Sequence, residues 1–201
     1  MTRMNKRSKL LVSMLVVGVL GSIAGLGIFG AFSATTTNAG NEVRSGNVLL
    51  SDNDAGSALY FLPNAKPGDT VTRCIKVTYT GSLNANVRLY TPDNSLGPLA
   101  QYVDLIITQG TQSSSTFPNC SGFTPSAGGG VLYTGTLANF STTRTNYATG
   151  IDTNPVSPAI GWNTNDTLVY QYQVTLNASA PATVEAQTTG THAFTWEAVN
   201  N

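Results

Sequence analysis

The acidic residues near position 52 are the first candidates for metal chemistry. Asp52, Asp54 and Gly56 resemble the start of a calcium loop, in which oxygen ligands stand at positions 1, 3 and 5 and a glycine at position 6. The match is incomplete, because Ala55 precedes Gly56 and Asn64, not glutamate, lies near the far end. We therefore expect a turn here, with a weak calcium site at Asp52 and Asp54 as the alternative.

Side chains that catalyse reactions are scarce in this sequence. His192 is the only histidine and lies beside Phe194 and Trp196 in the predicted last strand. One histidine cannot supply the usual zinc ligands without help from carboxylates, so we predict an imidazole at a strand end that bonds the backbone or solvent. The chain has no Gly-x-Ser-x-Gly elbow, and the glycines at 128–130 have no nearby lysine to hold a phosphate. These features predict no catalytic residue, no metal and no cofactor.

The two cysteines favour a structural role over a reactive one. Cys74 and Cys120 lack the Cys-x-x-Cys spacing of redox and zinc motifs. An even number of cysteines in an exported chain predicts a disulfide. The bond would stabilise the fold by roughly 4 kcal/mol in the chain-entropy model, less any strain. Two unpaired buried thiols are the alternative.

The charge balance argues against nucleic acid as a partner. The 201 residues include ten Lys and Arg and ten Asp and Glu, so only 10% are charged, where about 25% is usual. Four of the basic residues fall in the first nine positions, which leaves six basic and ten acidic residues and a net charge of −4. A body without a basic cluster cannot neutralise several phosphates at once.

The N-terminal third predicts export. After the basic start, residues 10–32 carry no charge, and small residues suited to a signal peptidase follow near Gly30, Ala31 and Ala34. We expect a signal peptide over 1–30, a polar extended arm over 31–46 and a folded domain over 47–201. The alternative is a retained membrane anchor, because residues 10–32 could span about 30 Å of hydrocarbon.

Alternating apolar and polar residues rich in Thr, Val and Tyr predict a protein made of β-strands. Residues 66–69 form a Pro-Gly turn suited to type II, because Gly68 accepts a positive φ. Two short helices are expected, over 136–142 and 182–187. Many strands with so little helix indicate an all-β, antiparallel β-sandwich or barrel. The expected strands cover 48–50, 58–62, 70–80, 85–90, 102–109, 131–134, 166–177 and 192–199.

Parity within the predicted strands indicates which faces are buried. In strand 166–177 one face is apolar and the opposite face is mostly polar, which indicates that it covers a core with one side. In strand 70–80, by contrast, Cys74, Val77 and Tyr79 do not share a parity. We therefore expect that strand to be buried on both sides or bulged.

Several segments resemble the TasA/camelysin family of exported bacterial proteins, whose leader is processed by a SipW-type signal peptidase. The resemblance covers both ends of the chain and the first third of the body, and residues 91–165 show no match. It implies a jelly-roll sandwich that assembles into biofilm matrix fibres, with an N-terminal segment lending a strand to the next subunit. The matching segments are GIFGAF at 27–32, SGNVLLS at 45–51, LPNAKPGD at 62–69, GSL at 81–83 and FTWEA at 194–198.

The arm has the properties of a donated strand. It contains no proline before position 41, so every residue keeps its N–H, and Phe32 offers a large apolar group. We expect a secreted structural subunit that polymerises with itself, with related matrix subunits as further partners. The alternatives are a membrane-anchored module for surface binding or adhesion and, third, a camelysin-like metallopeptidase, although the chain has no His-Glu-x-x-His. The residues expected to form the assembly arm are Ala31, Phe32, Ala34, Thr36 and Asn38, and all of them except Ala31 share one face.

Overall fold

The computed structural model describes residues 5–7, 11, 14–15, 42, 44–113, 116–155 and 161–200. The chain divides into two units, Met1–Arg44 and Ser45–Asn201. Nearly all of the predicted leader, and with it the arm residues Ala31, Phe32, Ala34, Thr36 and Asn38, lies outside the described residues. Within the described part of the chain, no helix is both long and apolar enough to cross a membrane.

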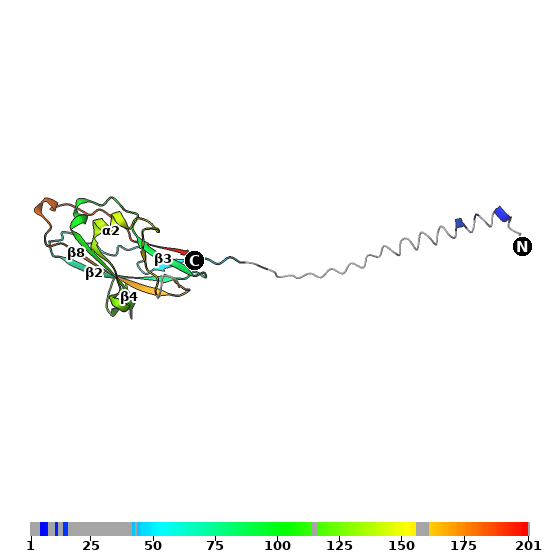
Figure 1. Cartoon of the computed structure of the whole chain (residues 1–201), viewed down its shortest axis with the longest axis horizontal. Coiled ribbons are helices and arrows are strands. Elements are labelled where there is room, and N and C mark those ends of the chain that lie inside the picture. Colours follow the sequence, from blue (N-terminus) through cyan, green and yellow to red (C-terminus); the bar gives the residue numbers. More distant parts are fainter. Residues whose placement is uncertain are drawn as a thin grey trace. The chain divides into compact units, whose positions relative to one another are not determined.

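The second unit contains a large antiparallel sheet whose central strands are β2, β8 and β4 (Figure 1). The strands follow the order β1, β2, β8, β4, β5, and β6 pairs with β4 beside β5. Their bounds are β1 Leu50–Asp52, β2 Thr70–Tyr79, β4 Val103–Gln112, β5 Phe123–Pro125, β6 Val131–Thr136 and β8 Thr167–Leu176.

A smaller antiparallel sheet packs against the large one. Its order is β7, β3, β9, with β7 at Ile151–Asp152, β3 at Ala85–Tyr90 and β9 at Thr195–Asn200. Aromatic rings of β8 meet those of the β9 segment: Tyr172 lies 4.6 Å from Phe194, and Tyr170 lies 5.2 Å from Trp196, between ring centroids. Two sheets joined by one apolar core confirm the prediction of an all-β, antiparallel sandwich.

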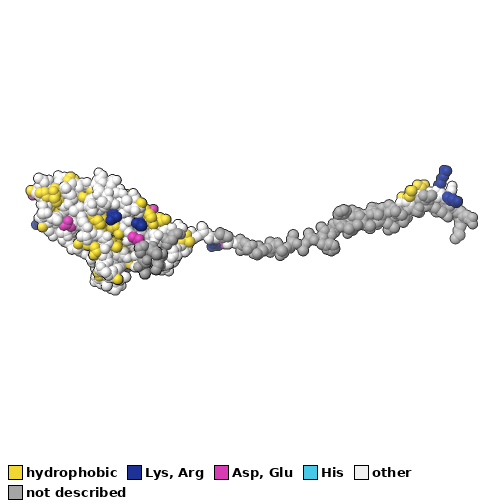
Figure 2. All heavy atoms as spheres, viewed as in Figure 1, with side chains coloured by type: hydrophobic (Ala, Val, Ile, Leu, Met, Phe, Trp, Pro, Cys, Tyr) yellow, Lys and Arg dark blue, Asp and Glu magenta, His cyan; other side chains and the backbone are white. Residues whose placement is uncertain are grey.

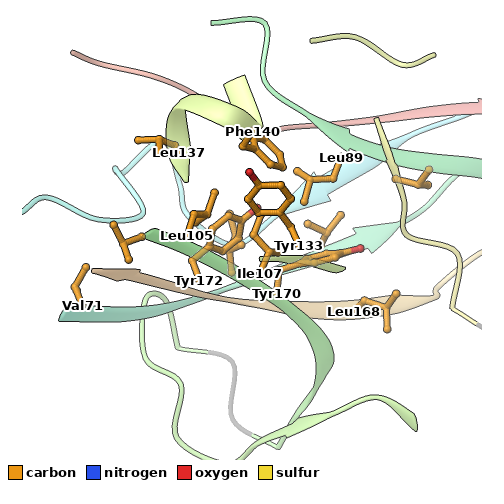
Figure 3. Packing of buried hydrophobic residues seen from close by; sticks show 14 of the residues in the cluster. Val71, Leu89, Leu105, Ile107, Tyr133, Leu137, Phe140, Leu168, Tyr170 and Tyr172 are labelled. Atoms are coloured by element: carbon orange, nitrogen blue, oxygen red, sulfur yellow. The ribbon is translucent and has the colours of Figure 1, made fainter. Parts of the chain in front are cut away.

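The core follows the predicted alternation. In β8 the even-numbered residues, including Tyr170 and Tyr172, are buried against the small sheet, and most odd-numbered ones are partly or fully exposed. Figure 3 shows these tyrosines packed with Leu105, Ile107 and Phe140. On the face shown in Figure 2, few side chains are charged, and apolar side chains lie among the uncharged polar ones.

The first predicted helix is confirmed as α2, Leu137–Thr143. Thr136 caps it by accepting a hydrogen bond from the Asn139 N–H at 3.1 Å, while Leu137 and Phe140 are buried on one face. The second predicted helix, 182–187, forms only the 3-10 turn η3, Ala182–Val184, because Ala186 has a φ of 58° that stops a right-handed helix. Two 3-10 turns were not expected, η1 at Pro98–Tyr102 and η2 at Ala127–Gly129.

Strands β2, β3, β4, β6 and β8 confirm the predictions to within about three residues at each end. β1 starts two residues later than expected, and β9 starts three residues later, at Thr195. The prediction of a strand at 58–62 is wrong, because that segment runs over a groove and pairs with no described strand. β5 and β7 were missed.

The turn at 66–69 forms as predicted: Gly68 has a φ of 95°, and the Asp69 N–H donates to the Lys66 carbonyl at 2.9 Å.

Candidate functional site

One edge of the large sheet, along β2, is covered at successive positions. In an antiparallel strand the N–H groups of alternate residues point to the same side. The Thr80 N–H donates to the Leu49 carbonyl at 2.8 Å. The backbone N–H and C=O groups of the even-numbered residues of β2 therefore point toward this edge. Past the end of β1, the Lys76 N–H donates to the Asn53 side-chain oxygen at 2.9 Å, which continues the ladder with an amide in place of a strand.

Further along, the cover comes from a distant loop and from β2 itself. The Cys74 N–H donates to the Pro118 carbonyl at 3.0 Å, and the Arg73 guanidinium donates to the Thr72 carbonyl at 2.9 Å. Arg73 has the parity of the core-facing residues Val71 and Ile75, so it is an inward-pointing charge turned back onto the edge, a known protection against strand pairing. We call Asn53, Arg73, Pro118 and the Cys74–Cys120 bond the β2 edge cover.

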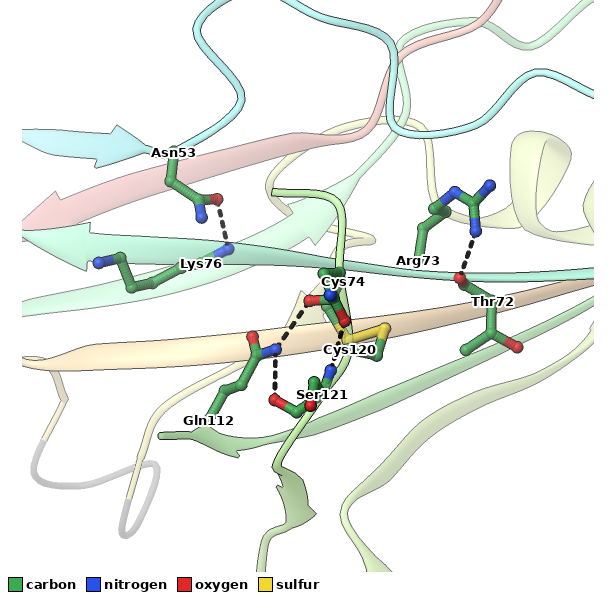
Figure 4. The surroundings of a disulfide bond; sticks show 9 residues. Asn53, Thr72, Arg73, Cys74, Lys76, Gln112, Cys120 and Ser121 are labelled. Carbon is green, nitrogen blue, oxygen red and sulfur yellow. Dashed lines mark hydrogen bonds between the residues drawn. A yellow bond between two sulfur atoms is a disulfide. The ribbon is translucent and has the colours of Figure 1, made fainter. Parts of the chain in front are cut away.

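The predicted disulfide between Cys74 and Cys120 is confirmed, and it holds this cover in place (Figure 4). It joins β2 to the loop between β4 and β5, as expected. The loop is held from β4 as well, because the Gln112 side-chain amide donates to the Asn119 and Ser121 carbonyls at 2.7 and 2.9 Å. The parity conflict in β2 is thereby explained: Cys74 lies on the outer face but is only 2% exposed, because it is bonded to the loop.

The small sheet has an edge without such a cover. The backbone N–H and C=O groups of the odd-numbered residues of β3 point away from β9. For example, the Thr153 N–H donates to the Val87 carbonyl at 3.0 Å. The even-numbered residues of β3 therefore bond to β9, where Arg88 pairs with Glu197. The backbone N–H and C=O groups of Trp196 and Ala198 point to the other side, and no described residue bonds them. We call this the β9 edge.

A groove of about 710 Å³ lies between the two edges. Its apolar floor comes from β2, β4, β8 and β9, and its walls are the segments 52–62 and 187–194. Phe61 lines the groove and is 80% exposed, so a large apolar ring stands uncovered there. Side chains that line the floor are Ile75, Val103, Val174, Leu176 and Trp196.

One polar pair joins the walls of the groove. Tyr60 and His192 approach to 2.5 Å between the hydroxyl oxygen and Nε2, and His192 Nδ1 lies 3.2 Å from the Gly190 carbonyl. Since a carbonyl only accepts, Nδ1 donates and Nε2 accepts from the tyrosine when the ring is neutral. Burial raises the pKa of Tyr60, so this hydroxyl keeps its proton. His192 thus bonds the backbone, as predicted, and also tethers segment 58–62.

The candidate calcium residues line the other part of the groove. The Asp52 side chain accepts from the Asp54 N–H at 3.2 Å, and the Asp54 side chain accepts from the Gly56 N–H at 2.6 Å, so both serve the turn. Loss of solvent raises the pKa of Asp52, helped by the nearby Asp54 charge. In the described ranges, no three His, Cys, Asp or Glu residues gather as metal ligands do.

No model of a known protein family matches the chain, and no curated protein matches it.

Sequence reasoning found the disulfide, but it missed the groove and the two edges. Neither Asn53 nor Arg73 was predicted to protect the edge of a sheet. One signal was available: an arginine at a core-facing position of a strand indicates an edge. The open side of β9 had no such signal, since its residues alternate as in any half-buried strand.

Proposed function

We propose that this chain is a secreted, non-enzymatic structural subunit that builds extracellular fibres, each copy donating its N-terminal arm to the β9 edge of the next. The observation that carries the proposal is the contrast between a covered β2 edge and an open β9 edge along one apolar groove. Exposed edges invite strand addition, and natural proteins cover them unless they are used.

The arm suits this acceptor in chemistry and length. Residues 31–41 carry no charge, so the arm would bring no charge of its own onto the apolar floor of the groove. An extended stretch of that length reaches about 36 Å, more than the roughly 20 Å of a six-residue strand such as β9. Main-chain bonds to Trp196 and Ala198 would hold it, while Phe32 and alternate small side chains enter the groove. The resemblance to the TasA/camelysin family supports the same function.

The test removes the donor and keeps the acceptor. A chain that lacks residues 31–37 but keeps a cleavable leader should fold and stay monomeric, whereas the intact chain should form filaments in negative-stain micrographs of cell-surface extracts. A matched control replaces 31–37 by seven Gly and Ser residues, which keeps the length and removes Phe32; it should also fail to polymerise. Filaments of wild-type appearance from the deletion variant would contradict strand donation.

A second function is favoured by the uncovered ring of Phe61 on the groove. In this alternative the leader remains as an anchor, and the groove binds an extended ligand from outside, such as a glycan or a peptide. The same micrographs distinguish the two functions, because an anchored module would stay with membranes as discrete particles.

A further inference from the structure

The two ends of the disulfide differ in access. Cys74 is 2% exposed within β2, whereas Cys120 is partly exposed in its loop. A cleft of about 490 Å³ borders the bond on one side, and it is lined by Cys120 and Arg73 but not by Cys74. A small reagent that enters the cleft therefore meets Cys120 before Cys74.

We propose that the Cys74–Cys120 bond is a removable lock on the β2 edge, opened by an exported dithiol through attack at Cys120. The thiolate of the dithiol forms a bond to Cys120 Sγ, the Cys74–Cys120 bond breaks, and the electron pair leaves on Cys74 Sγ, which takes a proton from solvent. The second thiol of the reagent loses its proton and attacks the mixed disulfide. Cys120 leaves as a thiol, and the dithiol is oxidised by two electrons to its disulfide.

Arg73 favours this direction of attack. Arg73 is one of the residues that line the cleft, and its positive charge attracts the incoming thiolate, whose negative charge is then shared among three sulfurs during exchange. Because the attacked sulfur belongs to Cys120, the mixed disulfide with the reagent forms on the loop and not on β2.

Opening the bond has a specific consequence for the sheet. The loop is then held by the Gln112 amide, by the single bond from the Cys74 N–H to the Pro118 carbonyl and by Phe117, which is partly buried against the core. These groups are partly or fully exposed, apart from Cys74, so water competes for them and the loop opens locally. The Cys74 N–H then becomes an unpaired edge group beside the groove. This lock acts on the sheet whether or not the chain forms fibres.

Limited reaction of the purified protein with glutathione, followed by N-ethylmaleimide and peptide mass spectrometry, tests the direction. We expect glutathione on Cys120 and maleimide on Cys74, by at least tenfold over the reverse. Arg73→Gln should slow the reaction severalfold at low salt, while Arg73→Lys keeps most of the rate. Glutathione found mainly on Cys74, or equal rates for Gln and Lys, would overturn the proposed attack.

Amide hydrogen exchange tests the lock. Reduction of the folded protein, and separately the Cys74→Ser/Cys120→Ser variant, should speed exchange at residue 74 at least tenfold while amides of β4 and β8 stay protected. Unchanged exchange at residue 74 would show that the cover does not need the bond. Loss of protection throughout β4 and β8 would show that the bond holds the whole fold and is no lock on one edge.

Discussion

The β2 edge and the β9 edge flank one groove, yet the chain treats them in opposite ways. At β2, four groups satisfy successive edge positions: β1, Asn53 directly after it, the loop at Pro118, and Arg73 of β2 itself. At β9, the described residues supply no hydrogen-bond partner for the backbone N–H and C=O groups of Trp196 and Ala198. The chain covers the β2 edge in several ways but leaves the β9 edge bare. This contrast indicates that the β9 edge pairs with another molecule.

The two edges also differ in how they could be changed. The β2 edge cover includes a covalent bond, so its state depends on redox chemistry. The β9 edge depends only on a binding partner. A fibre subunit gains from this difference, because a covered β2 edge cannot compete with the β9 edge for the donor strand, and competition would permit wrong pairing.

The largest expected effect comes from closing the β9 edge with proline. Ala198→Pro removes an N–H that has no partner within the described residues, so the domain should stay folded, with a loss below about 1 kcal/mol in unfolding free energy. Strand addition should be lost, because the donor strand no longer finds this N–H and meets a bulky ring. Denaturant unfolding and negative-stain microscopy measure the two effects.

The neighbouring residue supplies the matched control. Val199 pairs with Asn86, and its N–H points toward β3, so Val199→Pro breaks a ladder bond inside the sheet. It should destabilise the domain by about 1–3 kcal/mol. Equal stability of the two variants would show that the assigned direction of the β9 groups is wrong, and wild-type filaments from Ala198→Pro would exclude this edge as the acceptor.

Most of the large sheet could be predicted from the sequence, because its strands bury one face each. In β8 the alternation from Leu168 to Leu176 coincides with the burial of Tyr170 and Tyr172, so pattern and packing agree. The segment 58–62 shows where this reasoning fails. It has the composition of a strand, but the neighbouring edge of β2 is already occupied by Asn53 and Pro118, so its apolar residues enter the groove instead.

The candidate site was less predictable, since it depends on contacts between residues far apart in the sequence. A cysteine pair can be inferred from count and compartment, but the bond from the Cys74 N–H to the Pro118 carbonyl exists only after the loop has folded over the sheet. The short strands β5 and β7 were missed for the same reason: three and two residues carry no periodicity, and their partners in β4 and β3 define them.

Alkaline pH should lower the unfolding free energy of the domain through tyrosines of both the groove and the core. Burial raises the pKa of Tyr60, Tyr170 and Tyr172, whereas tyrosines in an unfolded chain titrate near about pH 10. Below that pH both states keep their protons and stability is unaffected. Above it the unfolded state releases protons first, so unfolding free energy should fall by about 1.4 kcal/mol per pH unit for each tyrosine, until the folded pKa is passed.

The Tyr60→Phe variant distinguishes the contribution of the groove tyrosine to this pH dependence from that of the core tyrosines. It removes one of the tyrosines with a raised pKa, so the slope of unfolding free energy against pH above about pH 10 should become shallower by about 1.4 kcal/mol per pH unit. Urea unfolding at several pH values measures the slope. An unchanged slope would mean that Tyr60 ionises freely in the folded protein and that the wall at 58–62 opens before the core unfolds.

The smallest expected effect tests whether the β2 edge cover acts as one unit or as independent parts. Asn53→Ala removes the acceptor of the Lys76 N–H, a partly buried group, and should cost about 1 kcal/mol. Asn53→Asp keeps an oxygen at the same position and is the control, because any other contact of the side chain is largely retained. Hydrogen exchange at Lys76 should speed up in the alanine variant only, while Cys74, held by Pro118 and the disulfide, stays protected. If Cys74 exchanges faster as well, the cover is cooperative and one weak point opens the whole edge; if Lys76 does not change, Asn53 is no part of the cover.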